Sequence, residues 1–395
     1  MITRALSAKL RAMAEVFPIV TVTGPRQSGK TTLCRMTFPN LPIVSLESPD
    51  VREYATRDPR SFLADFDDGA VFDEVQRVPA LLSYLQSRVD GRPEQRGRFI
   101  LTGSANFVLL ESVVQSLAGR SALLTLLPCA WPELGEFPSR PQDLDTAIFT
   151  GAFPALFDRG VAPADWYPSY VGTYLDRDVR QIVNVGNLEA FHTFVRLLAG
   201  RTGQLLNLSQ LGADAGVTHT TARAWVSVLE TSWLITRLPP LRANLGKRLT
   251  KSSKLYFLDT GLACHLLGLT SPTQVRQHPL RGALFETWVV AEALKARLNR
   301  GLVPAAAFYR DQNGAEVDLV IESGDQTLAV EIKAGATVVP DFFRGLDRFA
   351  TATAGRTWPP TLRRAVVYGG DSPQKRGDLL VVPWRELYRL GFDSH

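Results

Sequence analysis

Cysteine is scarce in this chain, and long apolar runs are missing. Only three cysteines occur among 395 residues, Cys34, Cys129 and Cys264, and their spacing is neither that of metal ligands nor that of a disulfide framework. We expect three small buried thiols and no need for an oxidising compartment. No stretch is apolar for long enough to cross a bilayer, and residues 1–11 lack the apolar core and cleavage site of a secretory signal. The sequence therefore predicts a cytoplasmic protein outside the membrane.

Repeats, low-complexity segments and patterned histidines are also lacking. His192, His265, His278 and His395 have no partner spacing, so we assign them no chemistry. The net charge is +5, with arginine far more frequent than lysine, which permits a polyanionic partner without demanding one. The length predicts two or three domains, because a single hydrophobic core stops growing well before this size.

The pattern along the chain changes character twice, which predicts three domains at residues 1–145, 146–270 and 271–395. In the first, short β-rich runs alternate with helical stretches, which favours an α/β fold with a parallel sheet and helices on both faces. The second reads as mostly helical and includes a small winged-helix unit. The third begins with a helix at 282–298 and continues into strands, which predicts another α/β domain.

A phosphate-binding loop follows the first apolar strand and precedes a helix. It matches the pattern G-x-x-x-x-G-K-[ST], which is specific in this context. The backbone amides and the helix N-terminus present positive partial charge to phosphates, Lys30 adds a full charge, and the Thr31 hydroxyl is a ligand for Mg²⁺. The expected ATP-binding residues are Gly24, Pro25, Arg26, Gln27, Ser28, Gly29, Lys30, Thr31 and Thr32, together with Asp73.

Two further strands of this region end in polar side chains. The apolar run at 69–72 ends in Asp73 and Glu74, where Asp73 can hold Mg²⁺ and Glu74 can activate the attacking water as a general base. The run at 99–101 ends near Thr102 and Ser104, of which we favour Ser104 as the group that senses phosphate or positions water. Alternatively, the acids form a solvated turn and the hydroxyls only cap the next helix.

These three segments, the phosphate-binding loop and the two strands with polar ends, resemble the AAA-type P-loop ATPases. They resemble in particular a bacterial and archaeal branch that joins such a module to a C-terminal domain of unknown function. Further segments that match this branch lie at 116–120, 174–178, 254–261 and 314–318, so the resemblance extends over nearly the whole chain. It implies ATP and Mg²⁺ as cofactors and a homo-oligomeric ring, of which a hexamer is one form. It also implies an arginine supplied by the adjacent subunit, for which Arg120 is the first candidate and Arg177 the second. Either arginine is alternatively an ordinary surface residue.

The C-terminal region carries a second constellation of charged residues. Asp318 lies within an apolar strand, and Glu331 and Lys333 lie on one face of the next strand, because side chains alternate with period two. Such a set can bind Mg²⁺ through Asp318 and Glu331, with Lys333 stabilising charge on a phosphodiester under attack by water. The alternative is an exposed, salt-bridged strand face.

This second pattern resembles the restriction-endonuclease-like nuclease core, in which Asp precedes Glu-x-Lys after a variable gap. Glu286, on the preceding helix, resembles the additional metal-binding acid of resolvase-like members. The resemblance implies a Mg²⁺-dependent DNA nuclease, or the same fold retained without cleavage.

Between the two sites, residues 208–229 have the pattern of a helix-turn-helix. Its second helix would present Thr218, His219, Thr221 and Arg223 to a DNA groove, while Lys247, Arg248, Lys251 and Lys254 on a following hairpin would contact phosphates. Winged helices serve equally as protein-interaction or packing modules.

Three functions therefore remain open at this point. The first is an oligomeric ATPase that acts on branched or duplex DNA. The second is a nucleotide-controlled regulatory or scaffold ATPase that binds a protein partner and cleaves nothing. The third is a nucleotide-binding protein without turnover, against which Glu74 argues.

Overall fold

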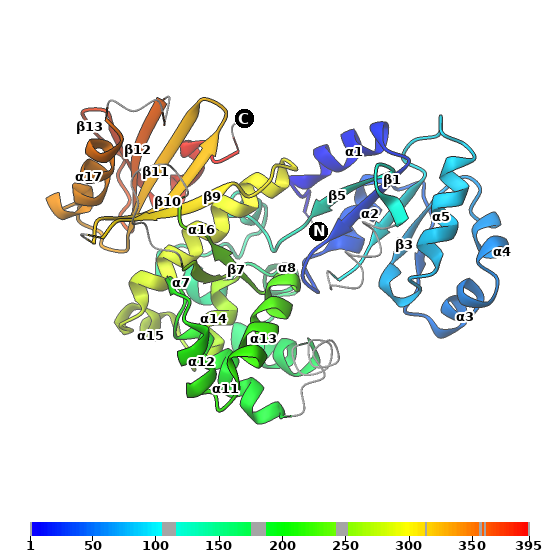
Figure 1. Cartoon of the computed structure of the whole chain (residues 1–395), viewed down its shortest axis with the longest axis horizontal. Helices are drawn as coiled ribbons and strands as arrows, with labels where there is room; N and C mark the ends of the chain where they lie inside the picture. Colours follow the sequence, from blue (N-terminus) through cyan, green and yellow to red (C-terminus); the bar gives the residue numbers. More distant parts are fainter. Residues whose placement is uncertain are drawn as a thin grey trace.

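The computed structural model describes residues 2–104, 116–174, 187–241, 252–312, 314–354, 358 and 361–393. Figure 1 shows three regions, an N-terminal one with its own sheet, a helical one drawn mainly in green, and a C-terminal one with a second sheet. The regions follow one another in the chain. The functional candidates are distributed over all three.

The N-terminal region is built on a five-stranded parallel sheet with the order β2-β3-β4-β1-β5. Its strands are β1 (Ile19–Thr23), β2 (Ile43–Ser45), β3 (Ala70–Asp73), β4 (Phe99–Thr102) and β5 (Ser121–Thr125). Because all five strands run in the same direction, their carboxyl ends meet at one edge. The expected α/β class is confirmed, and β4 separates the strand before the P-loop from the strand that ends in Asp73.

Helices cover both faces of this sheet, as the alternating side chains require. One face is covered by α1 (Leu6–Val16) and α2 (Lys30–Thr37), and the other by α3 (Pro49–Arg57), α4 (Pro59–Ala64) and α5 (Leu81–Asp90); a 3₁₀ turn, η1 (Val75–Arg77), follows β3. Val20, Val22 and their neighbours pack against α1 and α2. On the other face, Ile19, Phe72 and Phe99 pack with α3, α4 and α5.

The middle region is mainly helical and contains the expected helix-turn-helix. Its elements are η2 (Glu133–Glu136), α7 (Leu144–Thr150), α8 (Pro154–Asp158), α9 (Pro163–Tyr170), α11 (Leu188–Ala199), α12 (Leu208–Asp214), α13 (His219–Thr231), α14 (Thr260–Leu266) and α15 (Pro272–Gln277). Asn207 and Thr218 cap α12 and α13 by accepting hydrogen bonds from backbone amides three residues on. The region also contains a small antiparallel sheet in the order β6-β8-β7, made of β6 (Gln204–Leu205), β7 (Ile235–Leu238) and β8 (Lys254–Phe257).

The C-terminal region folds around a six-stranded mixed sheet with the order β13-β14-β12-β11-β10-β9. The strands are β9 (Ala306–Arg310), β10 (Glu316–Ser323), β11 (Gln326–Lys333), β12 (Thr361–Tyr368), β13 (Gln374–Arg376) and β14 (Leu379–Pro383), with η4 (Pro340–Phe343), α17 (Arg344–Thr353) and η5 (Trp384–Leu390) around them. The hairpin of β10 and β11 pairs Leu319 with Val330, so Asp318 and Glu331 lie one step further along adjacent strands.

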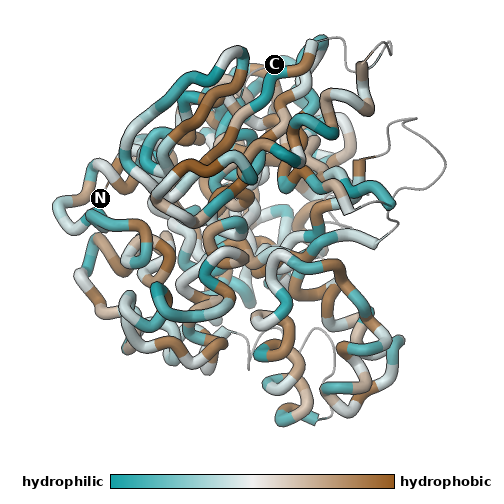
Figure 2. Tube along the Cα trace, turned by 90° about the vertical axis from the view of Figure 1, so that its left-hand side faces the viewer, coloured by the Kyte–Doolittle hydropathy of each residue, from teal (hydrophilic) through white to brown (hydrophobic). Residues whose placement is uncertain are grey.

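Helix α16 (Arg281–Asn299) is the central element of the molecule and is buried along most of its length. One buried cluster runs from Leu127 to Phe392 and joins the middle and C-terminal regions; Figure 2 shows apolar segments of the trace in this interior. A buried pair on α16, Lys295 and Glu292, also binds the chain just after β5, through the carbonyl of Cys129 at 3.0 Å and the amide of Trp131 at 2.6 Å. The boundaries after residues 145 and 270 stay predictions.

The three cysteines are free and buried, as expected. Burial raises the pKa of the Cys34 thiol to about 12 and that of Cys129 to about 11, so both stay protonated at neutral pH. Among the described helices, none has both the length and the apolar character needed to cross a bilayer.

Candidate functional site

The loop between β1 and α2 needs glycine at two positions for different reasons. A Cβ on Gly24 would lie 2.1 Å from the carbonyl oxygen of Leu126, so the backbone after β5 excludes any side chain there. Gly29 has a φ of +94°, which side chains rarely adopt. Gln27 also has a positive φ, of 60°. This sharp turn brings backbone amides and the N-terminus of α2 to one point, the arrangement that binds phosphate.

Lys30, the first residue of α2, is folded back over this loop. Its Nζ donates hydrogen bonds to the carbonyl oxygens of Gly24 at 3.1 Å and Pro25 at 2.9 Å. Burial lowers the pKa of Lys30, against the charges of Glu74 and Asp73, which raise it. The ammonium group is therefore held at the turn by carbonyl dipoles, with the two acids nearby.

Thr31 and Asp73 come together although 42 residues separate them in the chain. The Thr31 hydroxyl donates to Asp73 Oδ1 at 3.0 Å, and the Thr102 hydroxyl donates to the same carboxylate oxygen. A hydroxyl and a carboxylate are suitable ligands for Mg²⁺. Ser28 Oγ is buried in the loop and has no hydrogen-bond partner among the described residues. These residues fit a bound metal and phosphate group.

Glu74 lies next to this pair in a left-handed conformation, with a φ of 58°. This turn directs its carboxylate to the end of β4, where the Ser104 hydroxyl lies 3.3 and 3.5 Å from its two oxygens. The Gln76 amide donates to the same carboxylate. The ends of β3 and β4 therefore carry two side-chain pairs, Asp73 with Thr102 and Glu74 with Ser104.

A cavity of about 380 Å³ adjoins the loop on the side of the middle region. Gln27, Gly29 and Thr32 lie on its P-loop side. Pro154, Ala155, Asp158 and Arg159, in and just after α8, also line it. Apolar atoms of Ile2 and neighbouring residues contribute to the lining. The cavity is continuous with the P-loop and is large enough for part of a nucleotide.

Arg26 makes contacts beyond the P-loop. Its Nη2 lies 3.3 Å from Glu47 Oε1, and its guanidinium lies 6.0 Å from the centre of the Tyr174 ring. Arg26, one of the residues expected to bind ATP, is therefore held by contacts with residues outside the loop.

The acids predicted in the C-terminal region also lie in one cluster. Asp318 and Glu331 are each only 7% exposed, so the alternative of an exposed strand face is wrong for these two acids, although the salt bridge that it expected is present between Lys333 and Glu331. Asp318 Oδ2 accepts from the backbone amide of Ile332 at 2.8 Å, and Glu331 Oε1 accepts from Lys333 at 2.6 Å. Burial, and then the charge of Asp318, raise the pKa of Glu331 to about 8 and that of Glu286 to about 7.

Lys254 of β8 inserts its ammonium group into this cluster. It lies 2.8 Å from Glu286 Oε1 and 3.7 Å from Asp318 Oδ1, and it also pairs with Glu316. Burial alone would lower the pKa of Lys254, but the surrounding carboxylates outweigh burial and raise it. Its side chain is 4% exposed. The expectation that Lys254 contacts DNA phosphates from a surface hairpin is therefore wrong.

The described part of the chain contains no group of three His, Cys, Asp or Glu side chains arranged to hold a metal ion. The role of Glu286, Asp318 and Glu331 as Mg²⁺ ligands stays a prediction. In the structure, the ammonium group of Lys254 forms ion pairs with both Glu286 and Asp318.

Three family models match the chain in succession. Residues 16–135 match an AAA domain, which covers the P-loop, the β3 acids and the end of β4. Residues 141–273 and 281–387 match two different domains of unknown function.

Two relatives match almost the whole chain, an uncharacterized protein of Mycobacterium bovis and one of Mycobacterium tuberculosis. Each is 32% identical over 394 residues, which is 98% of this chain and 85% of the relative. The chain belongs to the family of these two proteins. Its N-terminal region is an AAA-type P-loop ATPase, as the domain match and the site geometry together require.

Solved structures similar to this ATPase are distant. A Walker-type ATPase of Pyrococcus abyssi is 16% identical with a TM-score of 0.42 and covers 66% of this chain and 94% of that chain. RuvB of Thermotoga maritima is 17% identical with a TM-score of 0.27, covering 59% and 87% respectively. A signal-transduction ATPase of Pyrococcus horikoshii is 11% identical with a TM-score of 0.23, covering 73% and 47%.

Arg120 of the ATPase lies at the opposite edge of the sheet from its own P-loop. Its carbonyl accepts from the amide of Ile19, the first residue of β1, and its guanidinium binds Asp90 at 2.5 and 2.8 Å. Its guanidinium is therefore held by Asp90 at the end of the sheet where the strands begin, and the P-loop follows the other end of β1. Arg177, the second candidate, lies outside the described residues.

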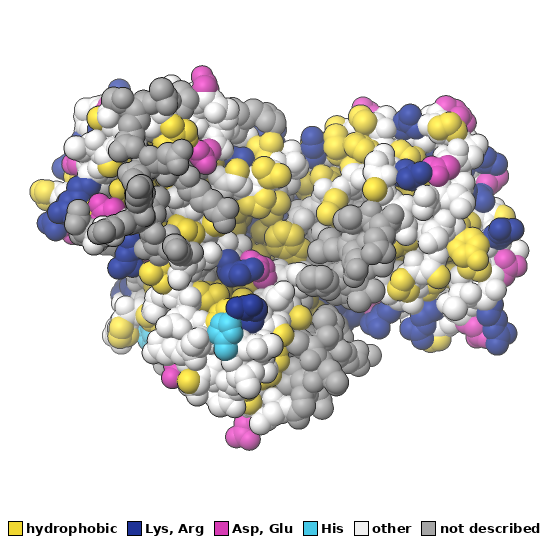
Figure 3. Space-filling model, in the orientation of Figure 1, with side chains coloured by type: hydrophobic (Ala, Val, Ile, Leu, Met, Phe, Trp, Pro, Cys, Tyr) yellow, Lys and Arg dark blue, Asp and Glu magenta, His cyan; other side chains and the backbone are white. Residues whose placement is uncertain are grey.

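The expected front edge of α13 is accessible. Thr218, His219 and Arg223 are exposed, and Thr221 is half-buried. Of the predicted hairpin cations, Lys247, Arg248 and Lys251 lie outside the described residues. On the face seen in Figure 3, the Lys and Arg side chains of the described residues are spread over all three regions and do not form a single stripe.

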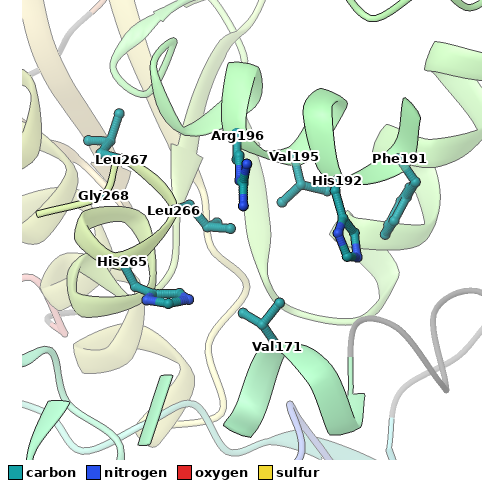
Figure 4. A pocket seen from close by; sticks show the side chains of 9 residues that line it. All are labelled: Val171, Phe191, His192, Val195, Arg196, His265, Leu266, Leu267 and Gly268. Carbon is teal, nitrogen blue, oxygen red and sulfur yellow. The ribbon is translucent and has the colours of Figure 1, made fainter. Parts of the chain in front are cut away.

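Another pocket, of about 320 Å³, lies between α11 and α14 in the middle region. Figure 4 shows His192, Arg196 and His265 around it, with Val171 and Phe191 among the apolar lining. Burial, and then the charge of Arg196, lower the pKa of His265, which is therefore neutral at pH 7. The pocket is lined by elements other than those of the ATP site and the acid cluster.

Arg4 was not predicted from the sequence, but it supports the P-loop by hydrogen bonds to the backbone. Its guanidinium donates to the carbonyl oxygens of Ser28 and Leu127, both at 2.8 Å, and lies 3.1 Å from Glu133 Oε1. Glu133 in turn accepts from the amides of Ala5 and Ala130, both at 2.7 Å. Because Arg4 lies 123 residues from Leu127 and Ala5 lies 128 residues from Glu133 in the chain, no local pattern could indicate these contacts.

Proposed function

We propose that this ATPase hydrolyses ATP with Mg²⁺ and that Glu74 is the general base. The observation that carries the proposal is the shared contact of Thr31 and Asp73 beside the P-loop, with Glu74 as the next residue. Mg²⁺ would be held by Thr31 and Asp73 and would supply charge neutralisation at the phosphates. The Lys30 ammonium would exchange its two carbonyl hydrogen bonds for phosphate oxygens.

Ser104 and Gln76 hold the Glu74 carboxylate in one orientation, which supports its role in directing an attacking water. The adjoining 380 Å³ cavity would receive the nucleoside part of ATP. Its walls come from the N-terminal and middle regions, so nucleotide binding would bridge the two.

The second part of the proposal is that the active form is a homo-oligomer, a ring by family resemblance, in which Arg120 of one subunit completes the site of the next. Its place at the end of the sheet where the strands begin supports action in trans, because the P-loop of its own subunit follows the other end of β1. Asp90 would hold its guanidinium in position.

Trans action predicts complementation between two inactive variants. Arg120→Ala is expected to lower ATP turnover about 10³- to 10⁵-fold, the range measured for such arginines, with little change in ATP affinity. Lys30→Met lacks a working site and retains Arg120. Mixing the two variants should restore activity in the sites that pair an intact P-loop with an intact arginine, measured as phosphate release.

Arg57→Ala is the matched control for charge, because Arg57 is an exposed arginine that pairs with Glu53 along α3. It should turn over ATP at the parent rate. Full activity of Arg120→Ala alone would refute the assignment.

The third part of the proposal is that the ATPase acts on DNA, branched or duplex. The helix-turn-helix of α12 and α13 has an exposed front edge, which supports this function, and the chain carries a net charge of +5. Cleavage by the C-terminal acids is a further step that rests on the sequence pattern alone.

One observation favours a different function, a regulatory or scaffold ATPase with a protein partner. Lys254 neutralises the acids that would otherwise hold the metal ion of a nuclease. In that case the C-terminal region would bind protein and cleave nothing.

A DNA titration at two salt concentrations separates these functions. We expect four-way, duplex and single-stranded DNA to bind, with affinity falling steeply between about 50 and 200 mM salt, by about 10³-fold or more for six or more phosphate contacts. Arg223→Glu, at the front of α13, should weaken binding, and Arg57→Glu, on the exposed face of α3, should not. The absence of salt-sensitive binding would decide for the protein-binding alternative.

A further inference from the structure

We propose that the cavity between α11 and α14 is a binding site for a small organic anion, a molecule with one carboxylate or phosphate group beside an apolar body. Arg196 would bind the charged group, with the imidazoles of His192 and His265 beside it. The site lies in the middle region, among elements other than those of the ATP site and the acid cluster. The inference therefore goes beyond the proposed function and does not depend on ATP hydrolysis.

The composition of the cavity wall points to this class of ligand. Its volume of about 320 Å³ is in the range of small-molecule sites. Among the described residues that line it, three side chains carry nitrogen donors and none carries a carboxylate. The apolar part of the wall is formed by Val171, Phe191, Val195, Leu266 and Leu267. Positive charge without an acid, next to an apolar wall, favours a ligand that is anionic at one end and apolar at the other.

The three nitrogen-bearing side chains come to the cavity from two helices. His192 and Arg196 are four residues apart on α11, so they lie on the same face of this helix. His265 comes from the end of α14, and Figure 4 shows all three side chains directed toward the same space. Because the two histidines belong to different helices, their spacing in the sequence does not indicate that they meet.

Arg196 is the charged residue of the proposed site. Its side chain is exposed, and within the described part of the chain its guanidinium forms no ion pair with an acid. Its charge acts on the cavity, because it lowers the pKa of His265 in addition to the larger effect of burial. A guanidinium that is not engaged by an acid can form two parallel hydrogen bonds with one carboxylate or phosphate.

A buried aromatic ring holds the imidazole of His265. Tyr167 is only 1% exposed, and its ring lies at 18° to the imidazole, with the two ring centres 6.2 Å apart. The Tyr167 hydroxyl donates to Asp259 at 2.6 Å, and Asp259 also caps α14 by accepting from the amide of Leu262 at 2.9 Å. One buried carboxylate therefore fixes both the helix that carries His265 and the ring beside it. A side chain held in this way loses little freedom when a ligand binds.

The helix-turn-helix supports the α11 side of the cavity. Phe191 lines the cavity, and its ring packs edge to face against Trp225 of α13, with the ring centres 5.2 Å apart. Phe194, also on α11, packs against the same indole at 5.1 Å. The cavity is thus formed between helices that are already packed, and the proposed ligand would lie one side chain away from α13.

The test measures the binding of four benzene derivatives to the full chain by ligand-observed NMR. Benzoate and phenyl phosphate are anions, benzamide is neutral, and benzylamine is a cation. Every protein carries Lys30→Met, so that the P-loop contributes little binding of phosphate groups. We expect at least one of the two anions to bind with a Kd of about 1 mM or lower. Benzamide and benzylamine should bind about 10-fold more weakly or not at all. The anion that binds more tightly identifies the carboxylate or the phosphate class.

Variants of Arg196 test whether this residue binds the charged group. Arg196→Gln should weaken binding of the anion about 10- to 100-fold, the effect of losing a hydrogen bond to a charged group. Arg196→Lys keeps the charge and should bind the anion more tightly than Arg196→Gln. The matched control is Arg57→Gln, which changes an exposed arginine of α3 and should leave the affinity unchanged. Because Arg196 is exposed, both of its variants should keep the Tm of the reference chain.

Photochemical cross-linking locates the site without any change to the cavity. The probe is 4-benzoylbenzoate, in which a carboxylate is joined to a photoreactive diaryl ketone. Mass spectrometry should find the label on peptides of α11 or α14. An excess of the anion that binds more tightly should protect these peptides, and the same excess of benzamide should not.

The remaining outcomes would overturn the proposal. Benzamide binding as tight as that of the anions would mean that the cavity selects the ring and not the charge. Unchanged affinity in Arg196→Gln, or an equal loss in Arg57→Gln, would mean that Arg196 does not bind the anion. Labels found only outside α11 and α14, or no binding of either anion up to about 10 mM, would mean that this cavity is not an anion site. A lack of ATP turnover in the parent chain would contradict the proposed function and leave these results intact.

Discussion

Lys30→Met is expected to abolish useful ATP binding and turnover. The side chain is 5% exposed, and its ammonium group is held over the loop by the carbonyl oxygens of Gly24 and Pro25. Methionine has similar length and packing but no charge to offer the phosphates. The loss of charge-assisted hydrogen bonds should weaken ATP binding about 10- to 100-fold. Turnover should fall about 10²- to 10³-fold further, since charge that develops in the transition state is no longer stabilised.

Calorimetric titration with ATP and Mg²⁺, together with phosphate release, measures both effects. Lys375→Met is the matched control, because Lys375 is an exposed lysine on β13, in the C-terminal sheet. Parent-like binding and turnover by Lys30→Met would refute the ATP site as a whole.

Glu74→Gln is expected to separate binding from hydrolysis. The amide is nearly the same size as the carboxylate and can keep the contact with Ser104, but it cannot accept a proton from water. Turnover should fall about 10²- to 10⁴-fold, the usual contribution of a general base. ATP affinity should stay within a small factor of the parent value, because Lys30, Thr31 and Asp73 are unchanged.

Binding of a fluorescent ATP analogue and single-turnover phosphate release measure the two quantities independently. Glu53→Gln is the control, an exposed glutamate on α3 that pairs with Arg57. If Glu74→Gln releases phosphate as fast as the parent, the base is a different group. If the variant instead loses ATP binding, Glu74 supports the loop and not the chemistry.

The ATP site could be predicted from the sequence because each of its parts is a short contiguous segment. The P-loop follows directly from one strand, and Asp73 and Glu74 lie at the end of another. Once the strands are known to be parallel, their carboxyl ends must meet at one edge. The contacts of Thr31 with Asp73 and of Ser104 with Glu74 follow from that topology.

The C-terminal acids were predicted to lie together for a similar reason, because β10 and β11 are joined as a hairpin. Their partner could not be predicted. The local sequence predicts that Lys254 belongs to a basic hairpin that contacts phosphates, since Lys247, Arg248 and Lys251 precede it. Burial of an ammonium group depends on carboxylates that lie 32 and more residues away, which a local pattern does not contain.

Short motifs in the chain are enough to predict the chemistry of the nucleotide site and the order of the elements that form it. Which charged side chains meet across the chain follows only from the packing of the folded elements. Arg4 donates to the carbonyl of Leu127, just after β5, and Lys295 of α16 donates to the carbonyl of Cys129 in the same segment. Lys254 forms an ion pair with Glu286 in the acid cluster. The physical reason is that periodicity and local motifs report on neighbours within one element. Ion pairs between buried groups depend on how whole elements pack, and only the folded chain fixes that.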